Sequence, residues 1–120
     1  MSTILFRVAA AFCLLAVGLG AFGAHALKAT LEANGTREIW NTAVLYHLTH
    51  AIVLVVLALH PASLRLASGL LTAGIVIFSG SLYILAITNT KWLGAITPIG
   101  GFCFLAGWLW LIFSPPSHNL

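Results

Sequence analysis

The sequence predicts an all-α integral membrane protein whose four transmembrane helices form an antiparallel up-and-down bundle. Three observations predict this fold class: 61% of the 120 residues are hydrophobic, only 6% are charged, and the apolar residues gather into four long stretches. A soluble domain carries roughly a quarter of charged residues, so this chain has too few charges to cover a surface that faces water. We expect residues 1–120 to form a single membrane domain.

Four apolar stretches are long enough to cross a bilayer, which takes about 20 residues of helix. The predicted transmembrane helices cover about residues 4–24, 37–59, 66–87 and 94–113. Each must be helical, because in lipid every backbone N–H and C=O group needs a partner within the protein. The connections "HPASLR" and "TNTKW" are short, so we expect successive helices to be antiparallel neighbours.

The longest connection, "HALKATLEANGTREIWN", predicts a short interfacial helix between the first two transmembrane helices. We place this helix at about residues 26–33, because Leu27 and Leu31 are spaced for one helical face and an Asn-Gly pair then ends it. Thr36 suits the N-cap of the next helix. Trp40 is expected at the level of the lipid headgroups.

Rows of small residues predict close helix packing. In lipid such rows let two helix backbones approach each other, and this close packing drives much of the association between helices. The rows are consistent with packing inside the bundle or with contacts to a second copy or a membrane-protein partner. The helix-packing candidates are Ala9, Cys13, Ala16, Gly20 and Ala24 in the first helix, and Gly80, Gly100 and Gly107 in the third and fourth.

A set of polar side chains interrupts the apolar stretches, and the predicted topology places them toward the same membrane face. At about 1.5 Å per residue, we expect His47 to lie about 6 Å below that face and His50 about 10–12 Å below it. The other half of the bundle, which contains Trp108, is expected to be almost purely apolar. The candidate ligand-binding residues are His25, Tyr46, His47, His50, Ser79, Ser81, Tyr83 and Thr97.

Several functions for this polar cluster stay open. It can be a hydrogen-bonded plug that fixes the register of the helices, or a site for a small ligand, a lipid headgroup or a proton. A metal site would use His25, His47 and His50, and a haem-binding redox protein is a further alternative. No cofactor is predicted, because the sequence places no carboxylate or thiolate beside these histidines. An accessory role in a larger membrane complex, through the small-residue rows, is the last alternative.

The sequence points away from enzymes, exporters and nucleic-acid binders. It contains no motif for a nucleophile–base pair or a phosphate-binding loop. A proton-coupled drug exporter needs a carboxylate within the membrane, whereas both acidic residues lie in the long connection around residues 32–38. The five basic residues are scattered singly, so they form no patch for nucleic acid. We therefore expect a non-enzymatic protein whose main partner is the lipid bilayer.

Four stretches, "LGAFGAHAL", "WNTAVLYHLTH", "FSGSLYILA" and "TPIGGFCFLAGW", resemble the YgdD/YwdK-like family of small membrane proteins, which has eukaryotic relatives. The resemblance covers about residues 4–113. It implies a four-helix membrane protein without an assigned biochemical activity. The positions that match the family pattern are Gly20, Gly23, His25, Tyr46, His47, His50, Ser79, Gly80, Ser81, Tyr83, Thr97, Pro98, Gly100 and Gly101.

The resemblance also implies a location in the plasma membrane, which is the inner membrane if the chain is bacterial. The face with the termini carries Arg7 and Arg65, and the other face carries Lys28, Arg37 and Lys91. This count does not fix the orientation by the positive-inside rule. The family's usual basic second loop favours termini on the cytoplasmic side, and we adopt that orientation as a prediction.

Overall fold

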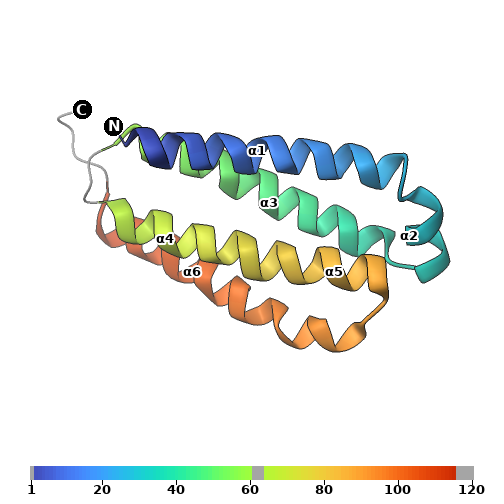
Figure 1. The fold of residues 1–120 in the computed structure, drawn as a ribbon. Helices are drawn as coiled ribbons and strands as arrows, with labels where there is room; N and C mark the ends of the chain where they lie inside the picture. Colours follow the sequence, from blue (N-terminus) through green and yellow to red (C-terminus); the bar gives the residue numbers. More distant parts are fainter. Residues whose placement is uncertain (1, 61–63, 116–120) are drawn as a thin grey trace.

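The computed structural model describes residues 2–60 and 64–115, and within these ranges the chain is helical with no strand. Four helices are long and apolar enough to cross a membrane (Figure 1). This confirms the predicted fold class. The elements are α1 (Thr3–Ala24), α2 (Lys28–Asn34), α3 (Arg37–Ala58), α4 (Arg65–Gly74), a π-helical segment (Ile75–Ser79), α5 (Gly80–Thr88), a 3₁₀ turn (Lys91–Ala95) and α6 (Thr97–Phe113).

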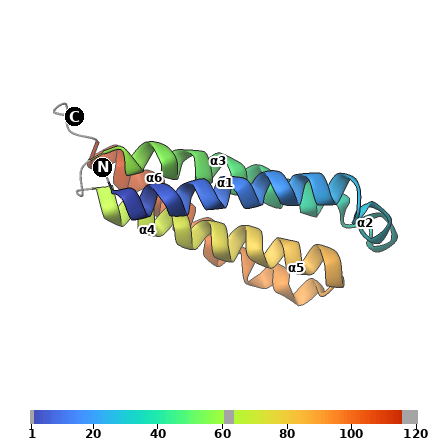
Figure 2. The same ribbon diagram turned by 45° about the horizontal axis from the view of Figure 1, so that its top comes forward.

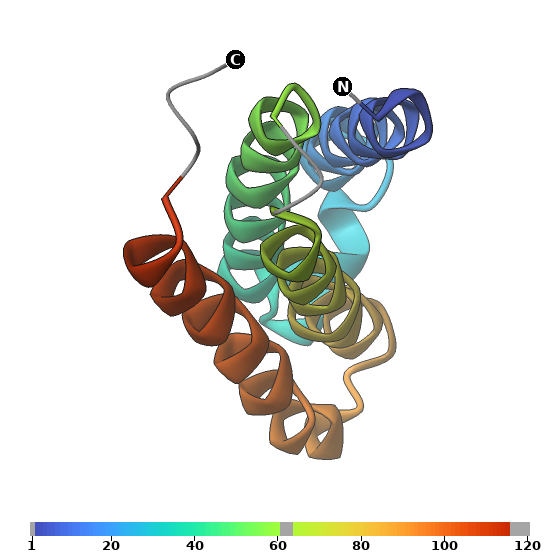
Figure 3. The same ribbon diagram turned by 90° about the vertical axis from the view of Figure 1, so that its left-hand side faces the viewer.

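The helices run up and down along one long bundle. The N-terminal end of α1 and the C-terminal end of α6 lie at the same end, and α2 closes the opposite end (Figure 1). Figure 2 shows α1 alongside α3 over most of its length, and the two helices are in extensive contact. Viewed from the end, α1 and α6 lie on opposite sides, with α3 and α4 between them (Figure 3).

The predicted helix bounds agree with the structure within a few residues. The interfacial helix predicted at 26–33 is α2, Lys28–Asn34. The predicted helix at 66–87 is a single span, Arg65–Thr88, interrupted by the π-helical segment. The fourth span starts earlier than predicted, because a 3₁₀ turn precedes α6. Pro61, in the connection between α3 and α4, lies outside the described residues.

Local chemistry explains where several helices begin and end. The Ser2 hydroxyl oxygen accepts a hydrogen bond from the Leu5 N–H at 3.2 Å, which caps α1. Two left-handed residues end helices: Gly35, with φ of 66°, follows α2, and Asn89, with φ of 56°, follows α5. Glycine and asparagine adopt this backbone conformation at the lowest cost.

Thr36 does not cap α3 with its side chain, contrary to the prediction. Its hydroxyl donates to the Ala86 carbonyl at 2.7 Å, and the Asn34 amide donates to the same carbonyl at 3.0 Å. These bonds satisfy a carbonyl in the last turn of α5, where helices leave such groups without helical partners. The turn between α2 and α3 is thereby fixed to the end of the third span.

Trp40 is buried inside the bundle, in the first turn of α3. Its side chain is 1% exposed, and its indole N–H donates to the Leu19 carbonyl at 3.0 Å. The ring lies directly over Gly23, where a Cβ atom would collide with the indole. This pairing of a large ring with a glycine holds α1 close to the first turn of α3.

Most of the small-residue rows lie between helices of this chain. Ala9 and Ala16 are fully buried, and Cys13 packs against the main hydrophobic core. A Cβ atom at Gly20 would come within 3.4 Å of Val44, and one at Gly107 within 2.8 Å of Leu71.

Gly100 allows the closest approach between two helices. A Cβ atom there would collide with the backbone of Phe78, in the π-helical segment. Ala24 and Gly80 differ from the rest of the rows, since Ala24 is exposed and a Cβ atom at Gly80 would meet nothing within 4 Å.

Candidate functional site

His50 is the centre of the best-defined polar arrangement within the membrane-spanning region. The indole N–H of Trp108 donates to Nε2 of His50 at 3.0 Å. Because an indole nitrogen can only donate, Nε2 must carry the lone pair, and Nδ1 must carry the proton. Nδ1 then donates to the Tyr46 carbonyl, 2.8 Å away. His50 is therefore a neutral imidazole with both nitrogens engaged.

The His50 ring also belongs to a group of stacked aromatic rings between α3 and α6. Phe104 lies nearly parallel to it, with ring centroids 3.8 Å apart. Tyr46 lies 4.7 Å from Phe78 and 6.1 Å from His50, again between centroids. The backbones of α3 and α6 approach each other at few points, so these large side chains bridge the gap between the two helices.

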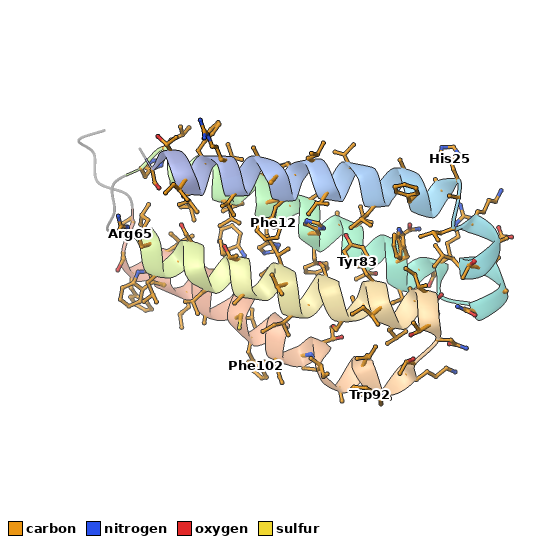
Figure 4. All side chains as sticks on the ribbon, viewed as in Figure 1. Phe12, His25, Arg65, Tyr83, Trp92 and Phe102 are labelled. Atoms are coloured by element: carbon orange, nitrogen blue, oxygen red, sulfur yellow. The ribbon has the colours of Figure 1, made fainter. Side chains whose placement is uncertain are left out.

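A pocket of about 420 Å³ opens beside this stack, and we call it the aromatic pocket. The Tyr46 side chain is 41% exposed, and no other described residue hydrogen-bonds to its hydroxyl. Phe102 points away from the other helices at the outer side of α6 (Figure 4). The residues that line the pocket are Tyr46, His50, Phe78, Pro98, Gly101, Phe102, Phe104, Leu105 and Trp108.

His47 takes part in a separate pair, on the side of α3 that faces α1 and α5. Its Nδ1 lies 2.8 Å from the Tyr83 hydroxyl, and the residue is only 3% exposed. The Phe12 ring of α1 packs edge-on against it, with centroids 6.0 Å apart. Figure 4 labels Phe12 and Tyr83, the two residues that contact His47. Nε2 of His47 is buried and has no hydrogen-bond partner among the described residues.

Ser79, Ser81 and Thr97 form separate hydrogen bonds between helices and do not join the bonds of the two histidines. The Ser79 hydroxyl donates to the Ala43 carbonyl at 2.8 Å, which links the π-helical segment to α3. The Ser81 and Thr97 hydroxyls lie 2.7 Å apart and join α5 to the start of α6. Among the described residues, Tyr83 is the one candidate whose side chain bonds to a candidate histidine.

His25 lies apart from the other two candidate histidines. It is exposed at the C-terminal end of α1 beside α2 (Figure 4), whereas His47 lies about ten residues inside α3. In residues 2–60 and 64–115, no three side chains among His, Cys, Asp and Glu are close enough to hold a metal ion. The structure therefore does not assemble the metal site suggested by His25, His47 and His50.

His47 and His50 lie well inside α3. Because α3 runs without interruption from Arg37, His47 and His50 lie about 15 Å and about 20 Å along it, at 1.5 Å per residue. They are near the middle of the span. Trp108 lies in the half that was expected to be apolar, yet it supplies the main partner of His50.

Sequence reasoning missed the aromatic residues that build the pocket. Phe104 and Trp108 are spaced four residues apart, so they share one face of α6 with neighbouring side chains. That spacing is the one signal that could have found them. It resembles ordinary core packing, and nothing in the sequence indicates that the facing residue is His50.

Charged residues lie only toward the two ends of the bundle. Arg7 and Arg65 lie toward the end with the termini, and the α2 end has the remaining basic residues and both acidic residues. Arg37 and Glu32 approach within 3.9 Å of each other there, with both side chains exposed. An exposed pair of this kind contributes little to stability. The aromatic pocket is lined without any charged side chain.

Comparison with known proteins identifies the chain's relatives. A family described as "Protein of unknown function (DUF423)" matches residues 19–101. UPF0382 membrane protein YwdK of Bacillus subtilis is 45% identical over 111 residues, covering 88% of this chain and 89% of its own. A UPF0382 membrane protein of Staphylococcus haemolyticus is 45% identical over 115 residues, covering 92% of this chain and 93% of its own.

A relative also exists outside bacteria. A UPF0382 membrane protein of Schizosaccharomyces pombe is 36% identical over 111 residues, covering 87% of this chain and 94% of its own. These matches confirm the resemblance found in the sequence motifs and the assignment as a multi-pass membrane protein. No solved structure gives a significant match.

Proposed function

Since the chain belongs to the DUF423 family of membrane proteins, whose function is unknown, we propose its function from the geometry of the site. The proposal is non-enzymatic binding of a ring-bearing molecule dissolved in the bilayer. The aromatic pocket between α3 and α6 would hold the ring. The observation that carries this proposal is a pocket walled by aromatic side chains, in which the hydroxyl of Tyr46 has no hydrogen-bond partner among the described residues.

The walls of the pocket favour a flat ligand. Phe104 and His50 stack nearly in parallel, and Phe78 and Trp108 complete the wall. Aromatic pairs prefer offset-stacked or edge-to-face arrangements, and each is worth about 0.5–1.5 kcal/mol beyond the area that it buries. A flat ring that enters from the bilayer can form several such contacts at once.

The Tyr46 hydroxyl selects for a hydrogen-bond acceptor on that ring. A hydroxyl without a partner in an apolar environment costs about 1–3 kcal/mol by mutational measures, so a carbonyl oxygen on the ligand would relieve an existing cost. His50 cannot offer a hydrogen bond of its own, because Trp108 and the Tyr46 carbonyl engage both of its nitrogens. The ligand class that fits is a membrane-soluble ring with a carbonyl, such as a quinone.

The same contacts support a binding role over a catalytic one. His50 has no nitrogen left to accept a proton from a substrate, and its ring is fixed from three sides. A general base must be within hydrogen-bond reach of the proton that it abstracts. No carboxylate, cysteine or second histidine is among the residues that line the pocket.

The binding experiment uses the full chain in lipid nanodiscs, with a short-chain quinone as the probe. Because a quinone quenches tryptophan emission on close approach, the saturable part of the quenching reports its arrival beside Trp108, one of the four tryptophans of the chain. Tyr46→Phe removes only the hydroxyl and should weaken binding about fivefold, as expected for one hydrogen bond. Gly101→Leu should abolish saturable quenching, because Gly101 lines the pocket and a Cβ atom there makes only an ordinary contact.

Gly18→Leu is the matched control, since a Cβ atom at Gly18 meets nothing within 4 Å and this glycine does not line the pocket. It should bind the probe like the unmodified chain. Equal quenching in Gly101→Leu and Gly18→Leu would contradict binding in this pocket.

A structural plug is the second candidate function for this site. The bond from Trp108 to His50 supports it, because it joins α3 to α6 deep in the bundle where their backbones are apart. The plug predicts lower stability for variants of either residue and no saturable binding of any probe. A second copy or a partner subunit has less support, because most of the small-residue rows lie between helices of the same chain.

A further inference from the structure

A second groove lies between α1 and α4, away from the aromatic pocket. The backbones of these two helices approach each other at few points, as do those of α3 and α6. A groove of about 900 Å³ lies in this gap, and no phenylalanine, tyrosine or tryptophan is among its lining residues. It begins at the end of the bundle that carries the termini. Its lining residues are Ser2, Ile4, Leu5, Val8, Leu57, His60, Leu64, Arg65, Ser68, Gly69, Thr72 and Ala73.

The groove is polar at one end and apolar along its length. Arg65, His60 and Ser2 lie at the end with the termini, where Arg65 begins α4 (Figure 4). From there the groove follows α4 to Ala73, a length of about 12 Å at 1.5 Å per residue. Ile4 and Val8 line the opposite side. The polar end therefore lies at a membrane surface, and the apolar part extends into the hydrocarbon.

The polar end has hydrogen-bond donors but no negative charge from a side chain. Arg65 is exposed and forms no ion pair with any described residue. Both acidic residues of the chain, Glu32 and Glu38, lie at the opposite end of the bundle. The Ser2 oxygen accepts the N–H of Leu5, so its hydroxyl hydrogen can still be donated.

The deeper polar groups of the groove are already satisfied. The Ser68 hydroxyl donates to the Leu64 carbonyl and the Thr72 hydroxyl donates to the Ser68 carbonyl, at 3.1 and 2.7 Å. Both bonds are local to α4, so they leave the groove wall apolar below Arg65. An occupant thus needs an anionic group at one end only and hydrocarbon beyond it.

We propose that this groove binds one anionic phospholipid, with its phosphate at Arg65 and an acyl chain along α1 and α4. A guanidinium forms strong charge-assisted hydrogen bonds with phosphate oxygens. A lipid fits better than a free anion, because most of the groove wall is apolar and faces the bilayer. The site is independent of the aromatic pocket, which lies between the other pair of helices.

The test is native mass spectrometry of the full chain, titrated in detergent with phosphatidylglycerol, phosphatidylcholine and inorganic phosphate. We expect one saturable phosphatidylglycerol, bound at least tenfold more tightly than phosphatidylcholine. Arg65→Gln should weaken phosphatidylglycerol binding roughly tenfold, the effect of losing one charge-assisted hydrogen bond, while Arg65→Lys should retain most of it. Arg7→Gln is the matched control, because Arg7 is exposed at the same end and does not line the groove.

A second variant tests the acyl-chain part of the groove without changing charge. Gly69 lines the groove, and a Cβ atom there would meet nothing within 4 Å, so Gly69→Leu should fold normally and fill the space. It should weaken phosphatidylglycerol binding, whereas Gly18→Leu should not. Equal binding of phosphatidylglycerol and phosphatidylcholine would overturn the proposal. The proposal would also be overturned if inorganic phosphate displaced phosphatidylglycerol and Gly69→Leu left its binding unchanged. That result would show a site for an anion and not for a lipid.

Discussion

The hydrogen bond between Trp108 and His50 allows a quantitative test of how this bundle is held together. Trp108→Phe keeps an aromatic ring on α6 but removes the N–H that donates to His50 at 3.0 Å. His50 is 6% exposed, so its Nε2 would be left as a buried acceptor without a partner. An unsatisfied buried group costs about 1–3 kcal/mol, and we expect Trp108→Phe to lower the free energy of unfolding by that amount.

The partner variant is His50→Phe, which preserves the ring that stacks on Phe104 and removes both nitrogens. This variant should lower the free energy of unfolding by a similar amount, because the Trp108 N–H then has no acceptor. In the double variant no polar atom of this pair is left unsatisfied, so its cost should be less than the sum of the two single costs. Interhelical hydrogen bonds in membrane proteins give coupling energies that average about 0.6 kcal/mol and reach about 1.7 kcal/mol.

The assay is reversible unfolding of the purified chain in mixed micelles with increasing sodium dodecyl sulfate, followed by circular dichroism. Trp110→Phe is the control, because Trp110 has the same exposed fraction as Trp108, 40%, and its indole forms no hydrogen bond with a described residue. If the loss of stability in the double variant equals the sum of the two single losses within about 0.3 kcal/mol, the usual scatter for independent sites, the hydrogen bond between Trp108 and His50 is refuted. Nitrogen NMR of His50 gives a second check, since the structure requires the proton on Nδ1.

Three further predictions use the same unfolding assay or purified protein. Gly100→Ala should lower the free energy of unfolding by about 1–3 kcal/mol, the range for overpacking, because its Cβ would collide with the backbone of Phe78. Gly80→Ala should lower it little, since a Cβ there has open space. Equal losses in the two variants would contradict the close approach of Gly100 to Phe78. Thr36→Val should lower the free energy of unfolding by about 1 kcal/mol, because it removes the 2.7 Å hydrogen bond to the Ala86 carbonyl. An unchanged free energy of unfolding would argue against that bond. Elemental analysis and absorption spectra of gently purified protein should show no stoichiometric metal and no haem band; a metal that is lost in a His47→Ala variant would contradict this.

Hydropathy and turn residues were sufficient to predict the fold. The prediction of four spans depends on the length of each apolar stretch, and that length can be counted directly from the sequence. The predicted stop at the Asn-Gly pair depends on the backbone preference of Gly35, which is also local. The interfacial helix followed from the same kind of evidence. Nothing in these inferences required knowledge of which helix contacts which.

The site was harder to predict because it depends on which helix faces lie opposite each other. Tyr46, His47 and His50 are close in sequence, yet His47 faces α1 and α5 while His50 faces α6. The sequence suggested one shared cluster, since positions i and i+3 lie on similar faces of a helix. The actual division arises because α3 lies between α1 and α6, so different sides of one helix meet different partners (Figure 3).

The π-helical segment shows why local evidence cannot predict this arrangement. Ile75–Ser79 widens the third span by one residue per turn, which such segments often do at functional sites. Within this segment the Ser79 hydroxyl donates to the Ala43 carbonyl, and the Phe78 backbone lies against Gly100. Both contacts are with other helices, and Phe78 is also a wall of the aromatic pocket. The segment therefore connects α3 to α6 at the level of the pocket, and the cost of Gly100→Ala should be accompanied by weaker quinone binding. A variant that loses stability while its quinone affinity is unchanged would show that the pocket is independent of this helix contact.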